Sequence, residues 1–192
     1  TQYLDLPLNL IELRGVATIA DRDGDSTSDS VSIDLGGNIR FADDGPRVST
    51  TPGGPVLVLD ESFLAVDATA DLSSLFTTTL DFGADGAGMV AYQLGTTVGP
   101  SGLMDALTGE SVNLSIVDGV IYGRTTAHEV FRVSVAEDGV VAFDQSRAVI
   151  HSPDSGPDQT RFLTGANLIT LTATATDGDS DTATATADIT GY

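Results

Sequence analysis

The sequence contains no cysteine, no tryptophan and no lysine. Without cysteine the chain has neither disulfide bonds nor thiol catalysis, so a hydrophobic core or bound metal ions must stabilise its fold. No stretch approaches eighteen consecutive apolar residues, and the chain opens with neither a charged nor an apolar signal region. We therefore expect neither insertion into a membrane nor a visible secretion signal.

Positive charge is also scarce. Eight arginines stand against 28 acidic residues, and the formal net charge is -20 at pH 7. A surface this acidic excludes nucleic acid as a partner, because the phosphates repel it. So large a charge of one sign also destabilises a compact chain unless cations neutralise part of it, which favours bound Ca²⁺ or a saline habitat. Both conditions fit an extracellular protein.

Residues suited to catalysis are few. His128 and His151 are the only histidines, and no Gly-x-Ser-x-Gly motif is present. His128 is followed by Glu129, but the second histidine of a zinc-protease helix does not follow. The sequence therefore predicts that the protein is not an enzyme.

Apolar and polar residues alternate along most of the chain, which is the pattern of half-buried β-strands. Residues 168–176 and 182–188 alternate with period two on either side of an acidic turn. Asp-Gly pairs between alternating segments predict two further hairpins, at 111–123 and 130–143. Only 102–107 has a short helical pattern. Many short antiparallel strands separated by turns predict an all-β chain, folded as an antiparallel β-sandwich with long loops.

One acidic motif occurs twice. The string Asp-Gly-Asp-Ser begins at Asp23 and again at Asp177, a separation of 177 − 23 = 154 residues. A repeat of this length is a whole domain. We therefore predict one period of a tandem array, with 43–192 as the main repeat unit. Residues 1–42 are expected to be the tail of a preceding repeat, or N-terminal strands packed on the domain.

Aspartates at alternate positions of a turn suit a cation with many oxygen ligands, and Ca²⁺ is the obvious candidate. The predicted ligands are Asp21, Asp23 and Asp25 in the first copy and Asp177, Asp179 and Asp181 in the second. An EF-hand is excluded, because its glycine and glutamate positions hold Ser26 and Ser32. The alternative is that both stretches are ordinary solvated turns.

A second set of acidic residues flanks the proline- and glycine-containing stretch 50–55, which predicts a junction between units. Asp43 and Asp44 precede this stretch, and Asp60 and Glu61 follow it. These four carboxylates could bridge the junction through a shared Ca²⁺, or they could be ordinary turn residues.

The stretch 81–88 is rich in glycine and aspartate, and it is similar to half of the glycine-rich nonapeptide of Ca²⁺-binding β-rolls. One copy cannot build a solenoid, but its glycines permit the backbone to approach a ligand closely. We predict a ligand-binding loop here, with the polar loop 146–161 as a possible wall of the site. The predicted ligand-binding residues are Asp81, Asp85, Gly86, Gly88, His151 and Asp154.

Several of these segments are informative in combination. They are 41–46 (FADDGP), 59–62 (LDES), 82–88 (FGADGAG), 144–151 (DQSRAVIH) and 168–179 (LITLTATATDGD). Together they resemble the repeat domain of giant repeats-in-toxin adhesins, which Gram-negative and often marine bacteria export by type I secretion.

The resemblance implies a Ca²⁺-dependent module on the bacterial cell surface, adjoining neighbouring repeats, that binds a peptide or protein terminus on a host or partner cell. Two alternatives remain, a Ca²⁺-rigidified spacer repeat that binds nothing and a glycan-binding adhesin domain. An immunoglobulin-like extender needs about 100 residues, so the longer period here leaves surplus residues in loops such as 95–110 and 144–161. This surplus favours binding, although surface insertions cost little free energy.

Overall fold

The fold is described from a computed structural model, in which residues 3–77, 80–152 and 161–191 are placed. Almost every regular element is a β-strand, so the predicted all-β class is confirmed. Within the described residues, no helix is long and apolar enough to cross a membrane. The chain divides into two compact units, Thr1–Asp44 and Gly45–Tyr192, and each is described by itself.

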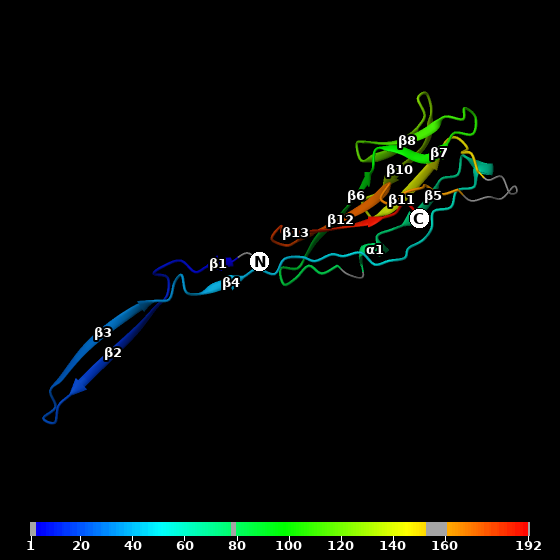
Figure 1. Ribbon diagram of the computed structural model, residues 1–192. Coiled ribbons are helices and arrows are strands. Elements are labelled where there is room, and N and C mark those ends of the chain that lie inside the picture. Colours follow the sequence, from blue (N-terminus) through cyan, green and yellow to red (C-terminus); the bar gives the residue numbers. More distant parts are fainter. Residues whose placement is uncertain (1–2, 78–79, 153–160, 192) are drawn as a thin grey trace. The chain divides into compact units, whose positions relative to one another are not determined.

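The first unit consists of two antiparallel strand pairs, drawn in blue and cyan in Figure 1. β1 (Tyr3–Asp5) pairs with β4 (Arg40–Ala42), and β2 (Glu12–Ala20) forms a hairpin with β3 (Ser26–Asp34). The Arg40 guanidinium supports the first pair by donating a hydrogen bond of 2.6 Å to the Asp5 carboxylate. Every residue of β2 is exposed, so this hairpin has no core of its own.

The second unit contains two sheets. The larger sheet has six strands in the order β5-β11-β10-β9-β8-β7, and the smaller has three in the order β13-β12-β6. The strands of the larger sheet are β5 (Ala68–Asp71), β7 (Gly99–Met104), β8 (Ser111–Val117), β9 (Val120–Arg124), β10 (Glu129–Val135) and β11 (Val140–Gln145). Those of the smaller sheet are β6 (Ala87–Thr96), β12 (Ile169–Asp177) and β13 (Thr182–Asp188). A 3₁₀ turn, η1 (Glu61–Phe63), and a short helix, α1 (Ser74–Thr77), precede β6.

The core of the second unit lies between these two sheets. Leu171 and Ala173 of β12 are fully buried, in one hydrophobic cluster with Val112, Ile121 and Val141 of the larger sheet. Every second residue of β12 is buried, as the alternation of apolar residues with threonine predicts. The expected hairpins at 111–123 and 130–143 are also present, as β8–β9 and β10–β11.

The helical prediction for 102–107 is wrong. Residues 99–104 form β7, which pairs with β8 at the edge of the larger sheet. Gly99 and Gly102 have φ values of 133° and 79°, which no α-helix contains. The buried Ser101 hydroxyl also donates to the Val112 carbonyl at 2.7 Å, which ties the segment to the neighbouring strand.

The hairpins β2–β3 and β12–β13 are closed by the same turn. In the first, the Asp21 N–H donates to the Asp25 carbonyl at 2.9 Å, and the Asp25 N–H donates back to the Asp21 carboxylate at 3.0 Å. In the second, Asp177 and Asp181 exchange the same two bonds at 3.1 and 2.8 Å. One aspartate at the start of each turn therefore closes it through both its backbone and its side chain.

The backbone of the two turns confirms this correspondence. The fourth residue of each has a positive φ, 103° at Gly24 and 82° at Ser180. The structural equivalent of Asp177 is thus Asp21. The shared Asp-Gly-Asp-Ser string pairs Asp23 with Asp177, so an alignment on the string is shifted by two residues from the structural equivalence. The turn geometry is determined by the hydrogen bonds of the first aspartate, and the position of the glycine does not determine it.

Candidate functional site

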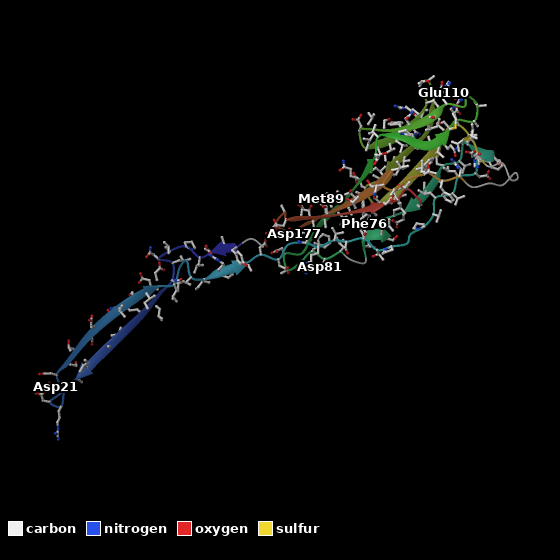
Figure 2. The ribbon with its side chains drawn as sticks, in the orientation of Figure 1. Asp21, Phe76, Asp81, Met89, Glu110 and Asp177 are labelled. Atoms are coloured by element: carbon white, nitrogen blue, oxygen red, sulfur yellow. The ribbon has the colours of Figure 1, made fainter. Side chains whose placement is uncertain are left out.

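Asp177 is the last residue of β12, and its carboxylate is buried within the turn that follows. Only 4% of the residue is exposed, and Figure 2 labels it at the end of the strand. Its Oδ1 accepts the Asp181 N–H, whereas its Oδ2 is buried and has no hydrogen-bond partner among the described residues. A buried carboxylate oxygen without a donor is destabilising, and a positively charged group bound there would offset the loss of its hydration.

The loop that precedes β6 covers this turn. Ala87 lies opposite the last residue of β12 in the strand pairing. A Cβ at Gly178 would lie 2.3 Å from the Asp85 carbonyl oxygen, and a Cβ at Gly88 would lie 2.3 Å from the Thr176 carbonyl oxygen. Both contacts are closer than any side chain allows, so glycine is required on each side. Gly88, within the glycine-rich stretch 81–88, therefore permits a close contact between two backbone segments.

Carboxylates from the loop and the turn lie close together. One carboxylate oxygen of Asp85 is within 4.8 Å of one from Asp179, and both residues are exposed. A Cβ at Gly45 would lie 3.4 Å from a carboxylate oxygen of Asp181 in the same turn. The side-chain ligand atoms of Asp85, Asp179 and Asp181 are carboxylate oxygens, which suit a hard cation such as Ca²⁺ and do not suit a thiolate-seeking metal. This cluster is the candidate metal centre of the second unit.

The equivalent turn of the first unit brings its three predicted ligands together. Carboxylate oxygens of Asp21, Asp23 and Asp25 lie within 4.8 Å of one another, and all three residues are exposed. A hydrogen bond with the Asp23 side chain, together with backbone donors, holds the pKa of Asp21 below its usual value. This turn has the same acidic residues as the second, but none of their side chains is buried.

Two further predicted metal ligands, Asp60 and Glu61, have other contacts. Asp60 caps η1 by accepting the Ser62 N–H at 2.9 Å, and the Ser62 backbone and hydroxyl lower the pKa of Asp60. The Glu61 carboxylate accepts hydrogen bonds from Gln145 and Val149 of the second unit. Asp43 and Asp44 are the last two residues of the first unit.

A cavity of about 370 Å³ lies in the second unit, away from the acidic turn. Its walls are mainly apolar and include Leu57, Leu103, Phe131, Phe143 and Phe162. The Phe131 and Phe143 rings stack with their centroids 4.8 Å apart. A cavity of this size and lining is typical of sites that hold small molecules or single side chains.

One wall of the cavity is polar and is organised by Glu61. The Glu61 carboxylate accepts the Gln145 amide at 2.6 Å and the Val149 N–H at 3.0 Å, and its second oxygen lies 3.2 Å from His151 Nε2. His151 Nδ1 is buried and has no hydrogen-bond partner within the described part of the chain. Arg161 also lines the cavity.

The predicted ligand-binding residues thus occupy two different places. His151 lines the cavity, but Asp81, Asp85, Gly86 and Gly88 do not. Asp81 instead exchanges backbone hydrogen bonds of 2.6 and 2.8 Å with Arg47, which fixes the start of the 81–88 loop. Asp154 lies outside the described residues.

Sequence reasoning missed a buried ion pair. The Asp105 side chain is fully buried and accepts two hydrogen bonds from the Arg147 guanidinium, at 3.1 and 2.8 Å, and one from the Thr108 hydroxyl at 2.6 Å. These donors, the guanidinium first, hold the pKa of Asp105 well below its usual range. The partners are far apart in the sequence, and no local pattern marks either of them.

A family model described as "Domain of unknown function (DUF5801)" matches residues 56–190, well over half of the chain. The chain belongs to the DUF5801 family. No curated protein and no solved structure matches it. The DUF5801 match includes both parts of the candidate metal centre, the 81–88 loop and the β12–β13 turn, and leaves the β2–β3 hairpin outside.

Proposed function

We propose that this DUF5801 domain is a Ca²⁺-dependent ligand-binding module of an extracellular bacterial adhesin, and not an enzyme. Ca²⁺ binds at the turn of β12–β13, where Asp177, Asp179 and Asp85 supply carboxylate ligands. The ion joins this turn to the 81–88 loop. It also offers open coordination positions to the carboxylate of a peptide or protein terminus on a partner cell.

The buried, unpartnered oxygen of Asp177 is the observation that supports Ca²⁺ binding. A carboxylate that is 4% exposed needs a donor or a cation at each oxygen to offset the loss of its hydration. With only eight arginines in the chain, a bound cation is the available source of positive charge. Acidic clusters on solvated turns do not bury a carboxylate in this way, as the exposed turn at Asp21 illustrates.

Two features favour ligand binding over a spacer role. Asp85 and Asp179 are exposed, so an ion between them keeps some coordination positions in contact with solvent. Ca²⁺ takes six to eight oxygen ligands, more than these side chains supply. An acidic protein needs such an ion to receive an anionic group. The separate apolar cavity has no use in a spacer and offers a second place for a ligand side chain.

A peptide array tests the functional proposal. The immobilised protein is probed in Ca²⁺ and in EDTA with peptides that carry a free C-terminal carboxylate and with their amidated twins. We expect retention of a subset of free-carboxylate peptides in Ca²⁺ and their release by EDTA. Asp85→Asn should weaken this retention, whereas Asp67→Asn, an exposed carboxylate without hydrogen-bond partners among the described residues, should not.

Other outcomes separate the alternatives. Ca²⁺ binding without retention of any peptide would favour the spacer function. Retention of glycans run in parallel, with no peptide retained, would favour a glycan-binding domain. Retention that ignores both EDTA and Asp85→Asn would contradict the proposed mechanism.

A further inference from the structure

The two equivalent hairpins match at their bases as well as at their turns. The Asn9 N–H donates to the Asp34 carboxylate at 2.9 Å, and the Asn167 N–H donates to the Asp188 carboxylate at 2.8 Å. Both asparagines have a left-handed backbone, with φ values of 64° and 56°. The hairpin of the first unit is therefore a second copy of β12–β13, with slightly longer strands.

The two copies differ in what covers their apolar face. In β12–β13, Leu171 lies opposite Ala187 and is fully buried against the larger sheet. In β2–β3, Leu13 lies opposite Ile33 at the position that corresponds when counted from the base of the hairpin, and these residues are 58% and 57% exposed. Ile19 and Val31 belong to the same face, because strand residues two apart point to one side, and they are 71% and 66% exposed. The apolar face that is part of the hydrophobic core in β12–β13 is exposed to solvent in β2–β3.

The copies also differ along one strand edge. β12 pairs with β13 on one side and with β6 on the other, over nine residue pairs from Ile169 to Asp177. Within the described residues, β2 pairs with β3 alone. The Asp21 N–H donates across the hairpin to Asp25. In an antiparallel pair the backbone N–H groups of successive residues point alternately toward the partner strand and away from it. The N–H groups of Arg14, Val16 and Thr18 therefore point away from β3. These groups form the edge that corresponds to the β6 side of β12.

We propose that the β2–β3 hairpin completes another β-sandwich that has the same fold as the second unit. That other sandwich has no equivalent of β12–β13 of its own, and β2–β3 takes this place. β2 pairs antiparallel with a strand equivalent to β6. The face that carries Leu13 and Ile33 then packs on a six-stranded sheet. The second unit of the same chain is not this partner, because β12–β13 already fills the corresponding place.

A tandem chain tests this inference. Residues 45–166 are joined directly to residues 9–192, so that the added sandwich lacks its own hairpin and is followed by β2–β3. We expect the added sandwich to fold. The amides of Arg14, Val16 and Thr18, measured by NMR hydrogen exchange, should then exchange at least about a hundredfold more slowly than in the protein of 192 residues.

A matched control keeps the hairpin of the added copy by joining residues 45–191 to residues 9–192. In this control the three amides should exchange as in the original protein. Leu13→Asp combined with Ile33→Asp should remove the protection in the first tandem chain and leave unfolding of the final sandwich unchanged. Fast exchange in the first tandem chain, failure of its added sandwich to fold, or equal protection in the control would each overturn the inference.

Discussion

Gly178 lies against the backbone of Asp85, so closely that a Cβ at residue 178 would be 2.3 Å from the Asp85 carbonyl oxygen. This contact connects two segments that are far apart in the sequence, the 81–88 loop and the turn after β12. It brings the carboxylates of Asp85 and Asp179 to one place, and the proposed Ca²⁺ site depends on it.

Gly178→Ala should therefore weaken Ca²⁺ binding without removing a ligand. The added methyl group meets a backbone oxygen, so the loop must move away from the turn. We expect the Ca²⁺ affinity, measured by calorimetric titration, to fall by at least about tenfold, or about 1.4 kcal/mol. Gly191→Ala is the matched control, because a Cβ there meets nothing within 4 Å. Equal affinities of the two variants would contradict the account of this contact.

The two hairpins should respond differently to loss of the same side chain. Leu171→Ala removes a fully buried leucine from the core and should lower the free energy of unfolding by about 2–5 kcal/mol. Leu13→Ala, at the equivalent but exposed position, should change it by no more than about 0.5 kcal/mol. Denaturant unfolding of the two variants checks this. A large loss with Leu13→Ala would show that the β2–β3 face is already covered in the isolated protein.

The buried ion pair of Asp105 and Arg147 should make the stability of the folded protein fall at acidic pH, when the Asp105 carboxylate is protonated. The pKa of Asp105 is lower in the folded protein than its ordinary value of 3.8. Asp105 therefore stabilises the fold at pH values above 3.8, and this contribution is lost as the pH falls toward the folded-state pKa. Asp105→Asn should destabilise the protein strongly at pH 7, because Arg147 loses its partner. Asp105→Asn should also make the free energy of unfolding fall less steeply below pH 3.8. Urea unfolding at a series of pH values measures both effects, and Asp67→Asn, the control, should show neither the loss at pH 7 nor the change below pH 3.8.

Glu61 should support the polar wall of the cavity. Its carboxylate accepts hydrogen bonds from the Gln145 amide and the Val149 N–H and lies 3.2 Å from His151 Nε2, and a glutamine at this position removes the negative charge and one of the two acceptor oxygens. We expect Glu61→Gln to lower the free energy of unfolding by about 1–3 kcal/mol. Glu137→Gln, at an exposed position in the turn before β11, should have almost no effect. If both variants have the same stability, the hydrogen bonds of Glu61 contribute nothing.

Much of the fold follows from local patterns in the sequence. The alternation of apolar residues with threonine in 168–176 predicts a strand with one buried face, and β12 has that face. The Asp-Gly turns at 118–119 and 138–139 predict hairpins that are present as β8–β9 and β10–β11. At 102–107 the local pattern was misleading, since two glycines with positive φ take the chain along a sheet edge as β7.

The arrangement of the candidate sites could not be predicted, because it depends on contacts between distant segments. The sequence identifies the 81–88 loop and the acidic turn separately, and only the pairing of β6 with β12 brings them together. In the same way, Glu61 meets His151 across 90 residues to form one wall of the cavity. The burial of Asp177, on which the metal proposal rests, also has no local signal, since Asp21 in the equivalent turn is exposed.

Ca²⁺ should raise the stability of the protein, and Mg²⁺ should substitute for it poorly. A ligand that binds only the folded state stabilises it by about 2.7 kcal/mol at a free concentration of about 100 Kd. Mg²⁺ demands a smaller octahedral shell and releases its water reluctantly. Scanning calorimetry in EDTA, in Ca²⁺ and in Mg²⁺ checks this, with the highest Tm expected in Ca²⁺. Identical melting curves in all three would exclude a structural Ca²⁺ ion.

The most direct measurement is a calorimetric Ca²⁺ titration of the protein and of its Asp177→Asn variant. The substitution keeps the shape of the side chain and its acceptor for the Asp181 N–H, but it removes the charge of the buried oxygen. We expect the Asp177→Asn variant to lose one Ca²⁺ site, or to bind Ca²⁺ there at least about a hundredfold more weakly, and we expect Asp67→Asn to retain the site. Unchanged stoichiometry and affinity in Asp177→Asn would contradict the proposed metal centre.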